Sequence, residues 1–360
     1  MVAGALANRP WNGGNAWNRL SFVLGLERLG FDVVFVEQVD RPSAEARAFF
    51  ELVCARFGVD GELVVDGHIS ERLLDRAREA AVLVNLGGHL TVDGVKSTAR
   101  LAIFVDDDPG YTQCWHAAGL LGHRLAGHHA FFTYGVNVGR QGCPIPTCGI
   151  EWKATRPPVV LAHWPVAPGD CTRLTTVASW RGGYGRLEFE GQLLGQKAHE
   201  FRKLAGLPAY VPQRLEIALA IDPADVPDRE LLENGGWTVV DPRAASEDPD
   251  AFRRYVQGSG GEISAAQGVY VQMRSGWISD RTASYLASGK PALVQNTGFE
   301  IAPSHAEGLV QFATAAEAAK GAQWIADDYG AHCEAARDLA SRLFDSDVVL
   351  GRMLEEAGLT

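Results

Sequence analysis

A turn near residue 275 combines the groups that bind a diphosphate. Arg274 and Arg281 flank Ser275, Gly276 and Ser279, at the point where an apolar segment gives way to an expected short helix. Backbone amides at a helix N-terminus, hydroxyls and guanidinium groups are common ligands of phosphate oxygens. The turn therefore indicates a nucleotide-type ligand. The alternative is an ordinary strand–helix turn with surface arginines.

Lys197 is a second candidate for contact with the same ligand. It opens an expected helix directly after the segment 191–195. A cation at a helix start is unfavourable to the helix dipole unless an anion is bound there. We therefore expect Lys197 to neutralise a phosphate, and the alternative is a solvated lysine.

Three carboxylates, Asp106, Asp107 and Asp108, follow an expected buried strand over 101–105. Carboxylates at a strand end can bind a divalent ion, orient hydroxyls or act as a general base. The alternative is an Asp-Pro-Gly turn that caps the next helix. Asp106 is the better chemical candidate of the three, and Asp108 is the better cap.

His89 lies in a glycine-rich loop after another expected strand, over 82–86. Imidazole titrates near neutral pH, so His89 is a candidate general base. A histidine in such a loop can equally be a simple hydrogen-bonding residue, and both interpretations stay open at this point.

The first strand leads into a loop that contains Asn12, Gly13, Gly14 and Asn15. A glycine pair lets the backbone approach a ligand closely and frees amides for an oxyanion, which suits a substrate-binding loop. The spacing is not G-x-G-x-x-G, and Asp32 comes too early for the usual ribose-binding acid. A conventional dinucleotide site is therefore disfavoured.

A metal site is not expected. Cys143 and Cys148 are the only close pair among six cysteines. A zinc site prefers shorter spacing and a second ligand pair, whereas two prolines stiffen this interval and no second pair follows. A proline-rich turn is the better interpretation.

Composition disfavours several kinds of partner. The 33 basic and 44 acidic residues give a net charge of −11, which disfavours nucleic acid and anionic membrane surfaces but not a small anion. No apolar run is long enough to span a membrane. The segment 1–6 lacks a basic leader and is interpreted as a strand rather than a signal peptide, so we expect a cytoplasmic protein.

These residues are positioned by alternating strand and helix patterns. A chain of 360 residues suits two domains, and short apolar strands between helices predict an α/β fold with doubly wound, mostly parallel sheets. A proline-rich passage places the linker near 165–172. We predict domains over 1–165 and 173–325, and C-terminal helices over 326–360 that cross back to the first domain.

Several strands and helix ends are expected from the local pattern. Val269 begins an apolar segment interpreted as a buried strand, and Ser279 and Gly289 mark the start and stop of the following helix. Thr314 is an expected N-cap of a later helix. Further strands are expected over 1–7, 32–37, 131–134, 159–162, 174–178, 215–221 and 237–240.

Six blocks of this sequence resemble bacterial glycosyltransferases of the GT-B architecture, several of which serve natural-product pathways. The blocks are 106–113, 131–135, 143–149, 175–180, 195–201 and 275–289. The resemblance implies two Rossmann-like domains that face each other across a cleft. It also implies that the acceptor binds mainly to the first domain and the nucleotide sugar to the second, with no required cofactor or metal.

The resemblance also implies roles for individual residues. The residues implied to bind the donor diphosphate are Lys197, Arg274, Ser275, Gly276, Ser279, Arg281 and Thr282. Those implied to contact the nucleoside or the sugar are Ser179, Trp180, Trp277, Asn296, Thr297 and Gly298. Similar sequences commonly have Asp at the position of Asn296 and a lysine near Gln267. This chain departs from that pattern.

The combined prediction is transfer of a sugar from a TDP- or UDP-linked donor to a hydroxyl of a small-molecule, natural-product type of acceptor. If the reaction inverts the anomeric carbon, a base is required, with Asp106 as first choice and His89 as second. Two alternatives remain: a sugar-nucleotide epimerase or hydrolase on the same scaffold, and a catalytically silent nucleotide-binding partner subunit. An oligomer is possible for each of them.

Overall fold

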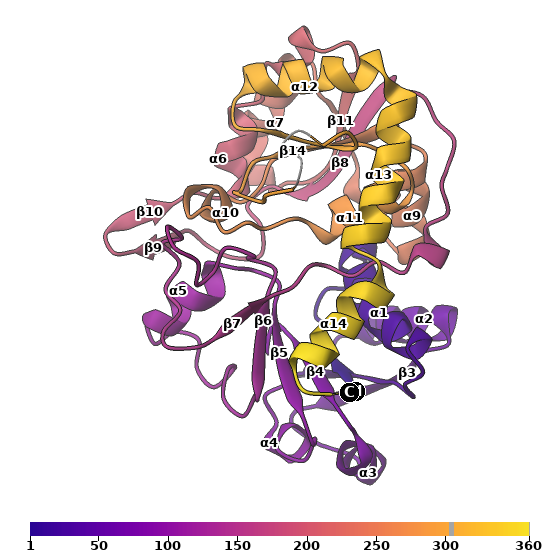
Figure 1. The fold of residues 1–360 in the computed structure, drawn as a ribbon, viewed down its shortest axis with the longest axis vertical. Coiled ribbons are helices and arrows are strands. Elements are labelled where there is room, and N and C mark those ends of the chain that lie inside the picture. Colours follow the sequence, from indigo (N-terminus) through magenta and orange to yellow (C-terminus); the bar gives the residue numbers. More distant parts are fainter. Residues whose placement is uncertain (302–305, 360) are drawn as a thin grey trace. The chain divides into compact units, whose positions relative to one another are not determined.

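Two parallel β-sheets, each with its own helices, make up residues 1–301 and 306–359, which the computed structural model describes. Unit 1 consists of Met1–Val160 and Asp345–Thr360, and unit 2 consists of Leu161–Phe344 (Figure 1). The predicted division assigned 326–360 as one returning tail. In the structure the helix Tyr329–Leu343 (α13) stays with unit 2, and only the last helix, Ser346–Glu356 (α14), belongs to unit 1.

The sheet of unit 1 has seven strands in the order β3-β2-β1-β4-β5-β6-β7, and every neighbouring pair is parallel. The chain winds outward in one direction from β1 and in the other direction from β4, so the order reverses between these two strands. The strands are β1 (Val2–Ala3), β2 (Val34–Val39), β3 (Asp60–Val65), β4 (Leu83–Leu86), β5 (Ala102–Asp106), β6 (Ala130–Thr133) and β7 (Trp152–Ala154).

Helices pack on this sheet through apolar side chains. Leu73 and Ala77 of α3 join Val34, Val36 and other strand residues in one buried cluster. On α1, Gly25 permits close approach of α14, because a Cβ there would lie 2.6 Å from Cδ1 of Leu350. The helices of unit 1 besides α14 are α1 (Gly13–Arg28), α2 (Ala44–Phe57), α3 (Glu71–Glu79), α4 (Asp93–Lys96) and α5 (Tyr111–Ala117).

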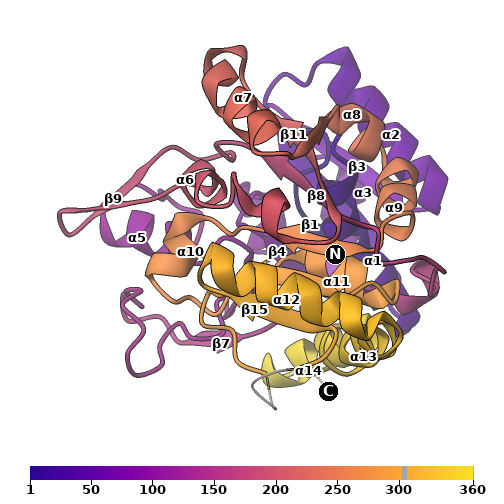
Figure 2. The ribbon, with the colours of Figure 1, turned by 90° about the horizontal axis from the view of Figure 1, so that it is seen from above.

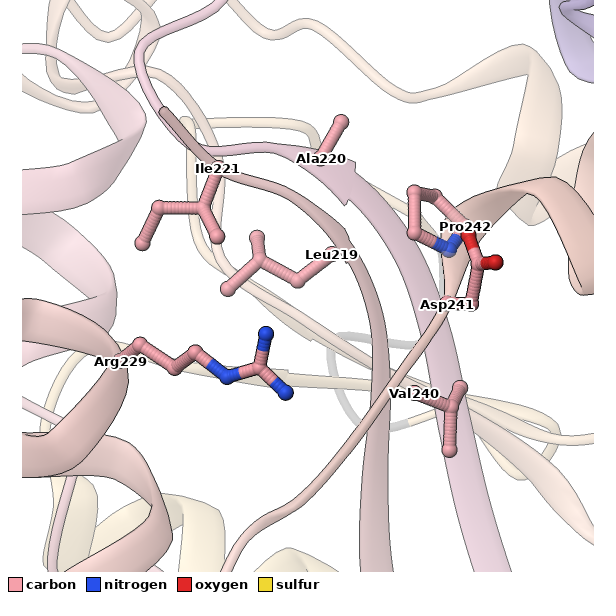
Figure 3. Close-up of a pocket in the computed structure, with 7 residues that line it drawn as sticks. All are labelled: Leu219, Ala220, Ile221, Arg229, Val240, Asp241 and Pro242. Carbon is pink, nitrogen blue, oxygen red and sulfur yellow. The ribbon is translucent and has the colours of Figure 1, made fainter. Parts of the chain in front are cut away.

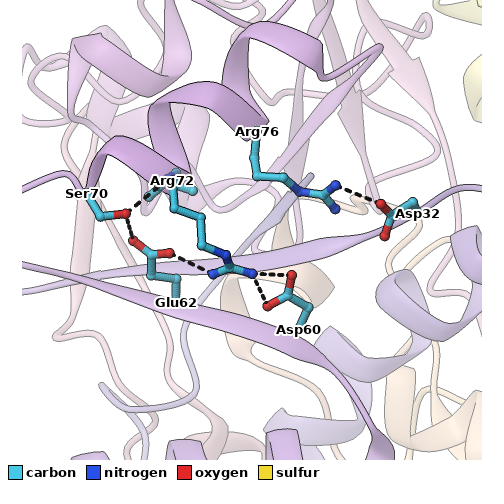
Figure 4. A network of polar contacts seen from close by, with 7 residues as sticks. Asp32, Asp60, Glu62, Ser70, Arg72 and Arg76 are labelled. Atoms are coloured by element: carbon cyan, nitrogen blue, oxygen red, sulfur yellow. Dashed lines mark hydrogen bonds and ion pairs between the residues drawn. The ribbon is translucent and has the colours of Figure 1, made fainter.

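A polar network joins α3 to the strands at the edge of this sheet (Figure 4). Arg72 pairs with Asp60 and Glu62 of β3, while Ser70 caps α3 and also donates to Glu62. Acidic residues on an outer strand discourage pairing with other chains. They also hide the apolar alternation that marks a strand, which is why β3 was not expected from the sequence.

The sheet of unit 2 has six parallel strands in the order β12-β11-β8-β13-β14-β15, and its order reverses between β8 and β13. A separate antiparallel hairpin, β9–β10, extends away from this sheet (Figure 1). The strands are β8 (Arg173–Ser179), β9 (Leu187–Phe189), β10 (Gln192–Leu194), β11 (Arg214–Ala220), β12 (Thr238–Val240), β13 (Gly261–Ser264), β14 (Ala292–Gln295) and β15 (Leu309–Phe312).

The helices of unit 2 cover this sheet, and α12 lies along β15 (Figure 2). One buried cluster joins strand residues to side chains from three different helices, namely Phe201, Leu232 and Ile325. The helices besides α13 are α6 (Lys197–Arg202), α7 (Val226–Asn234), α8 (Pro242–Ser246), α9 (Pro249–Gln257), α10 (Gly268–Gln272), α11 (Asp280–Ala287) and α12 (Ala315–Asp327), with 3₁₀ turns at Leu161–His163, Leu207–Tyr210 and Pro223–Asp225.

Two expected strands are wrong. The segment from Val269 lies in helix α10. The strand that precedes the turn is instead β13 (Gly261–Ser264), whose glycine and glutamate obscured its apolar pattern. At 159–162, Val159 makes only an isolated bridge to Asp345, and a 3₁₀ turn follows. In both cases a short apolar run did not distinguish strand from other buried backbone.

The expected helix boundaries are confirmed where a cap sets them. Ser279 is the N-cap of α11, and its hydroxyl accepts a hydrogen bond from the Arg281 amide. Thr314 caps α12 in the same way, through the Glu317 amide. After α11, Gly289 adopts a φ of +69°, a left-handed conformation that glycine adopts most easily.

Candidate functional site

The carboxyl edge of β8 and β13 is the candidate ligand site of unit 2, because ligands of open α/β sheets bind where the strand order reverses. Two glycines bring the backbone together there. A Cβ on Gly268 would lie 2.6 Å from the Gly195 carbonyl oxygen, which accepts a 3.1 Å hydrogen bond from the Val269 amide. The starts of α6 and α10 are thus held side by side.

Gln267 holds this arrangement together. Its Oε1 accepts a 2.7 Å hydrogen bond from the Lys197 amide. Its Nε2 lies 2.5 Å from the point that a Cβ on Gly182 would occupy, so the loop after β8 also packs against it. Similar sequences commonly have a lysine near this position. This chain has the neutral side chain of Gln267, which positions the first residue of α6.

Two cations belong to the same edge. Lys197 is half-buried at the first position of α6. Arg274 is exposed directly after α10 and has a φ of +47°, an uncommon conformation for a residue with a side chain. Residues held in such conformations often serve ligand sites. We name Lys197, Arg274, Gln267, Gly195 and Gly268 the unit-2 edge site.

The turn residues themselves mostly hold the turn. The Ser275 hydroxyl accepts a hydrogen bond from the Trp277 amide, and the Gly276 amide donates to the Thr297 carbonyl. Ser279 caps α11, and Thr282 is buried within that helix. The turn therefore has a fixed shape, and its hydroxyls already have protein partners.

Arg281 is placed differently from the sequence-based expectation. Its guanidinium donates to Glu262 Oε1 and to the Val177 carbonyl, at 2.7 Å in each case, and the Glu262 side chain is fully buried. This places Arg281 in an ion pair that joins α11 to β13 and β8. These contacts use the guanidinium to connect α11 to the sheet.

Trp180 is also a core residue. It is 1% exposed, and its indole nitrogen donates to Asp228 at 2.7 Å. Its ring therefore cannot stack on a base without unfolding part of the cluster. Trp277 is half-buried and packs on Tyr270 with ring centroids 4.5 Å apart, so one aromatic pair remains beside the turn.

The remaining residues expected at the donor lie at strand ends. Ser179 is the exposed last residue of β8, and Asn296 is exposed directly after β14. Asn296 Oδ1 accepts a 2.7 Å hydrogen bond from the Gly298 amide, and Thr297 is buried with its hydroxyl donating to the Trp277 carbonyl. Asn296, Thr297 and Gly298 thus form an ordered loop next to the turn.

A hollow of about 300 Å³ lies at the carboxyl ends of β11 and β12 and was missed from the sequence (Figure 3). The Arg229 side chain of α7 points into it, and Arg229 Nε donates to Glu233 at 2.9 Å. Its lining is mostly apolar and consists of Leu219, Ala220, Ile221, Arg229, Val240, Asp241 and Pro242. No motif marks this hollow, because its residues come from separate strands.

In unit 1 the corresponding edge, between β1 and β4, contains His89 and Asp107. A Cβ on Gly87 would lie 3.1 Å from His89 Nε2 and 3.5 Å from Asp107 Oδ1, so both groups border one small space. Arg19 of α1 pairs with Asp107 at 3.3 Å. Burial, together with the charges of Arg19, Arg124 and Arg9, lowers the pKa of His89 to about 3. Its ring is therefore neutral at pH 7.

Asp106 is not placed as a general base. It is fully buried, and each carboxylate oxygen accepts two hydrogen bonds. The donors are Thr112 Oγ1 and the Asp108 amide at 2.6 and 3.2 Å, and Gln113 Nε2 and Thr133 Oγ1 at 2.8 and 2.7 Å. Asp106 thus anchors the loop after β5. Helix α5 is capped at Gly110, not at Asp108 as expected.

This position makes the stability of the protein depend on the ionisation of Asp106. Burial raises the pKa of its carboxyl from 3.8 to about 6, against the hydrogen bonds that lower it. The folded state therefore binds this proton more tightly than the unfolded state does. The contribution of Asp106 to folding stability then falls as pH rises from about 4 to 6. We expect the stability advantage of wild type over Asp106→Asn to shrink by a few kcal/mol across that window, since one pKa unit is about 1.4 kcal/mol.

Urea unfolding of both proteins at pH 4, 5, 6 and 7 measures this difference. A difference that stays constant with pH, or grows as pH rises, would contradict the assignment. Asp75→Asn, an exposed carboxylate of α3, is the matched control and should show no such trend.

The loop from Asn12 to Asn15 begins α1. Asn12 is its N-cap, and its side chain accepts from the Asn15 amide at 3.0 Å, so that amide is not available to an oxyanion. Gly13 is buried and Gly14 half-buried at the first positions of the helix. The preceding loop is held by Glu37, which accepts the amides of residues 6, 7 and 8.

Residues 1–301 and 306–359 contain no group of three or more His, Cys, Asp or Glu side chains that could hold a metal ion. Cys143 and Cys148 form no disulfide with each other, and Cys148 is exposed with a φ of +52°. The same described part of the chain has no helix with the length and apolar character needed to cross a bilayer.

The two-unit architecture matches solved structures over the whole chain. HepE from Anabaena, in complex with UDP and glucose, superposes with a TM-score of 0.58 at 10% identity, covering 99% of this chain and 98% of that one. AviGT4, a glycosyltransferase involved in avilamycin A biosynthesis, gives 0.53 at 15%, covering 99% and 96%. The chain has the GT-B fold.

A third similar structure has a different description. A protein described as a UDP-N-acetylglucosamine 2-epimerase from Listeria monocytogenes gives a TM-score of 0.51 at 13% identity, covering 98% of this chain and 94% of that one. No family model matches the sequence, and no curated protein matches it. At these identities the comparisons establish the fold, and residue roles must come from the site itself.

Proposed function

We propose that this protein is a glycosyltransferase that moves a sugar from a UDP- or TDP-linked donor to a hydroxyl of a small molecule. The observation that carries the proposal is the unit-2 edge site. There Lys197 and Arg274 stand beside closely packed backbone at the reversal of strand order. Such a site suits a diphosphate, and its cations stabilise the negative charge that develops on a departing nucleoside diphosphate. HepE, which shares the fold, binds UDP-glucose.

The hollow beside Arg229 receives the nucleoside. It lies at β11 and β12, one and two strands away from β8, and neighbouring strands are about 4.8 Å apart. That offset suits the length of a nucleotide whose diphosphate is at the edge site. Pyrimidine carbonyls accept hydrogen bonds, and the Arg229 guanidinium is the donor that points into the hollow.

His89 is the base in this proposal, in place of Asp106. A neutral imidazole can take a proton from an acceptor hydroxyl, whereas an imidazolium cannot. The burial and positive charge that lower the pKa of His89 also weaken it as a base, so the role requires that bound substrate raise that pKa. Asp107, held by Arg19, borders the same small space as the ring. A base of this kind goes with inversion at the anomeric carbon. Because Lys197 and Arg274 neutralise the diphosphate, no metal is required.

The acceptor belongs to the natural-product type, and the likeness to AviGT4 supports this choice. The second candidate is epimerisation of a sugar nucleotide, which the likeness to the Listeria structure favours. The silent-subunit alternative rests on the neutral Gln267 and on Asn296, and both side chains have structural hydrogen bonds here.

Product analysis separates these functions. Purified protein is incubated with UDP-glucose or TDP-glucose and a panel of hydroxylated small molecules, and mass spectrometry follows both substrates. We expect UDP or TDP to appear in equal amount with a glycosylated acceptor. An epimerised sugar nucleotide without acceptor would establish the second candidate, and free glucose alone would indicate a hydrolase. No turnover with any acceptor would overturn the transferase proposal.

A further inference from the structure

A glycine-rich loop follows β8, one of the two strands between which the sheet order of unit 2 reverses. Residues 181–186, here named the glycine loop, have the sequence Arg-Gly-Gly-Tyr-Gly-Arg and lie outside helices and strands. Gly182 has a φ of +74°, and Gly183 and Gly185 are exposed. Glycine loses more conformational freedom on folding than any other residue. The glycine loop can therefore bind a ligand tightly only if other side chains fix its shape.

The side chain of Gln196 joins the two ends of the turn over 181–184. Its Nε2 donates to the Arg181 carbonyl at 3.2 Å and to the Tyr184 carbonyl at 3.0 Å. A primary amide nitrogen carries two hydrogens, and here each of them meets one carbonyl. Gln196 is 6% exposed and directly precedes Lys197, the first residue of α6. The amide of Gln196 thus has its full set of donor contacts within the protein.

Two more contacts fix the glycine loop from other sides. A Cβ on Gly182 would lie 2.5 Å from Nε2 of Gln267, so the loop packs directly on a member of the unit-2 edge site. The Arg181 guanidinium pairs with Asp225, which precedes α7, and its Nε donates to Asp225 Oδ2 at 2.7 Å. The glycine loop is therefore held against the edge site, and Gln196 is the residue that closes its turn.

We propose that Gln196 is a positioning residue of the donor site. It holds the glycine loop in the shape that binds the nucleoside diphosphate, and it does not touch the ligand itself. This inference rests on the proposed function. Without its two hydrogen bonds the loop samples several conformations, and a ligand must then order the loop as it binds. The affinity for UDP falls as a result, although Lys197 and Arg274 are still present.

The main variant is Gln196→Met, which keeps the length of the side chain and removes its donor. The matched control is Gln213→Met. Gln213 is also a buried glutamine of unit 2, and its Nε2 donates to the Ala322 carbonyl at 2.8 Å. It directly precedes β11 and so lies at the amino end of the sheet, away from the edge site.

A second variant disturbs the glycine loop without changing Gln196. Gly182→Ala places a Cβ against the Gln267 amide and strains a backbone with positive φ. For wild type and all three variants, calorimetry measures the dissociation constant of UDP. Hydrogen exchange followed by mass spectrometry measures the opening of the glycine loop before UDP is added.

We expect Gln196→Met to bind UDP about tenfold more weakly than wild type, as loss of loop-ordering hydrogen bonds implies. Its glycine loop should exchange faster, Gly182→Ala should also bind UDP more weakly, and Gln213→Met should match wild type in both measurements. Unchanged UDP affinity in Gln196→Met or Gly182→Ala, unchanged exchange of the loop in Gln196→Met, or an equal loss in Gln213→Met would overturn the inference alone. A wild type that binds no UDP would overturn the proposed function, and this inference with it.

Discussion

Replacing His89 by alanine is expected to lower the rate of sugar transfer by about 10² to 10⁴-fold, the usual contribution of a general base. UDP binding should not change, because His89 belongs to unit 1 and the edge site to unit 2. Steady-state kinetics with UDP-glucose and a transferable acceptor measure the first effect, and calorimetry with UDP measures the second. His89→Gln should be equally slow, because an amide makes hydrogen bonds but does not accept the proton.

The pH profile gives an independent test of the same assignment. Burial and nearby arginines hold the pKa of His89 at about 3, so the ring stays neutral as pH falls from 8 to 5. We expect the rate to show no loss assignable to His89 across that range. Full activity of both His89 variants would contradict the role of this residue, as would a loss of rate near pH 6.5 that disappears in His89→Gln.

Arg281→Met is expected to cost about 3–5 kcal/mol of folding free energy, because removing one partner of a buried ion pair leaves the other charge uncompensated. The partner is Glu262, which is fully buried. The variant also leaves the Val177 carbonyl without its donor. Chemical unfolding measures the loss, and Arg342→Met, an exposed arginine of α13 paired with Asp338, serves as the control.

The double variant Glu262→Gln/Arg281→Met sharpens this test. Removing both charges should recover part of the stability, since no uncompensated charge remains. If Arg281 instead bound the diphosphate, Arg281→Met would fold with nearly wild-type stability and lose affinity for UDP. That pattern would restore the role expected from the sequence.

Local signals in the sequence predicted local structure well. The hydroxyls of Ser279 and Thr314 lie at helix starts because a cap depends only on residues within one turn. Lys197 likewise begins α6 as expected. The alternation of strands and helices was sufficient for the α/β class and for two parallel sheets. These predictions did not require knowledge of how distant segments pack.

Predictions that depended on burial were less successful. Asp106, Trp180 and Arg281 have the right chemistry for a site, but the structure turns each side chain inward to protein partners. Whether an arginine reaches a ligand or a buried glutamate 19 positions away is decided by sheet register, which the local sequence does not contain. The Arg229 hollow was missed for the same reason.

Binding of UDP to the unit-2 edge site is the most direct test of the central claim. A ligand that binds only the folded state stabilises it by about 2.7 kcal/mol at a hundredfold excess over its dissociation constant. We predict that UDP or TDP raises the melting temperature of wild type, whereas ADP and GDP do not. Lys197→Ala and Arg274→Ala should each weaken the shift. Arg78→Gln, which removes an exposed arginine of α3, is the control and should not. A melting temperature unmoved by every nucleoside diphosphate, or shifted equally in all variants, would contradict the account.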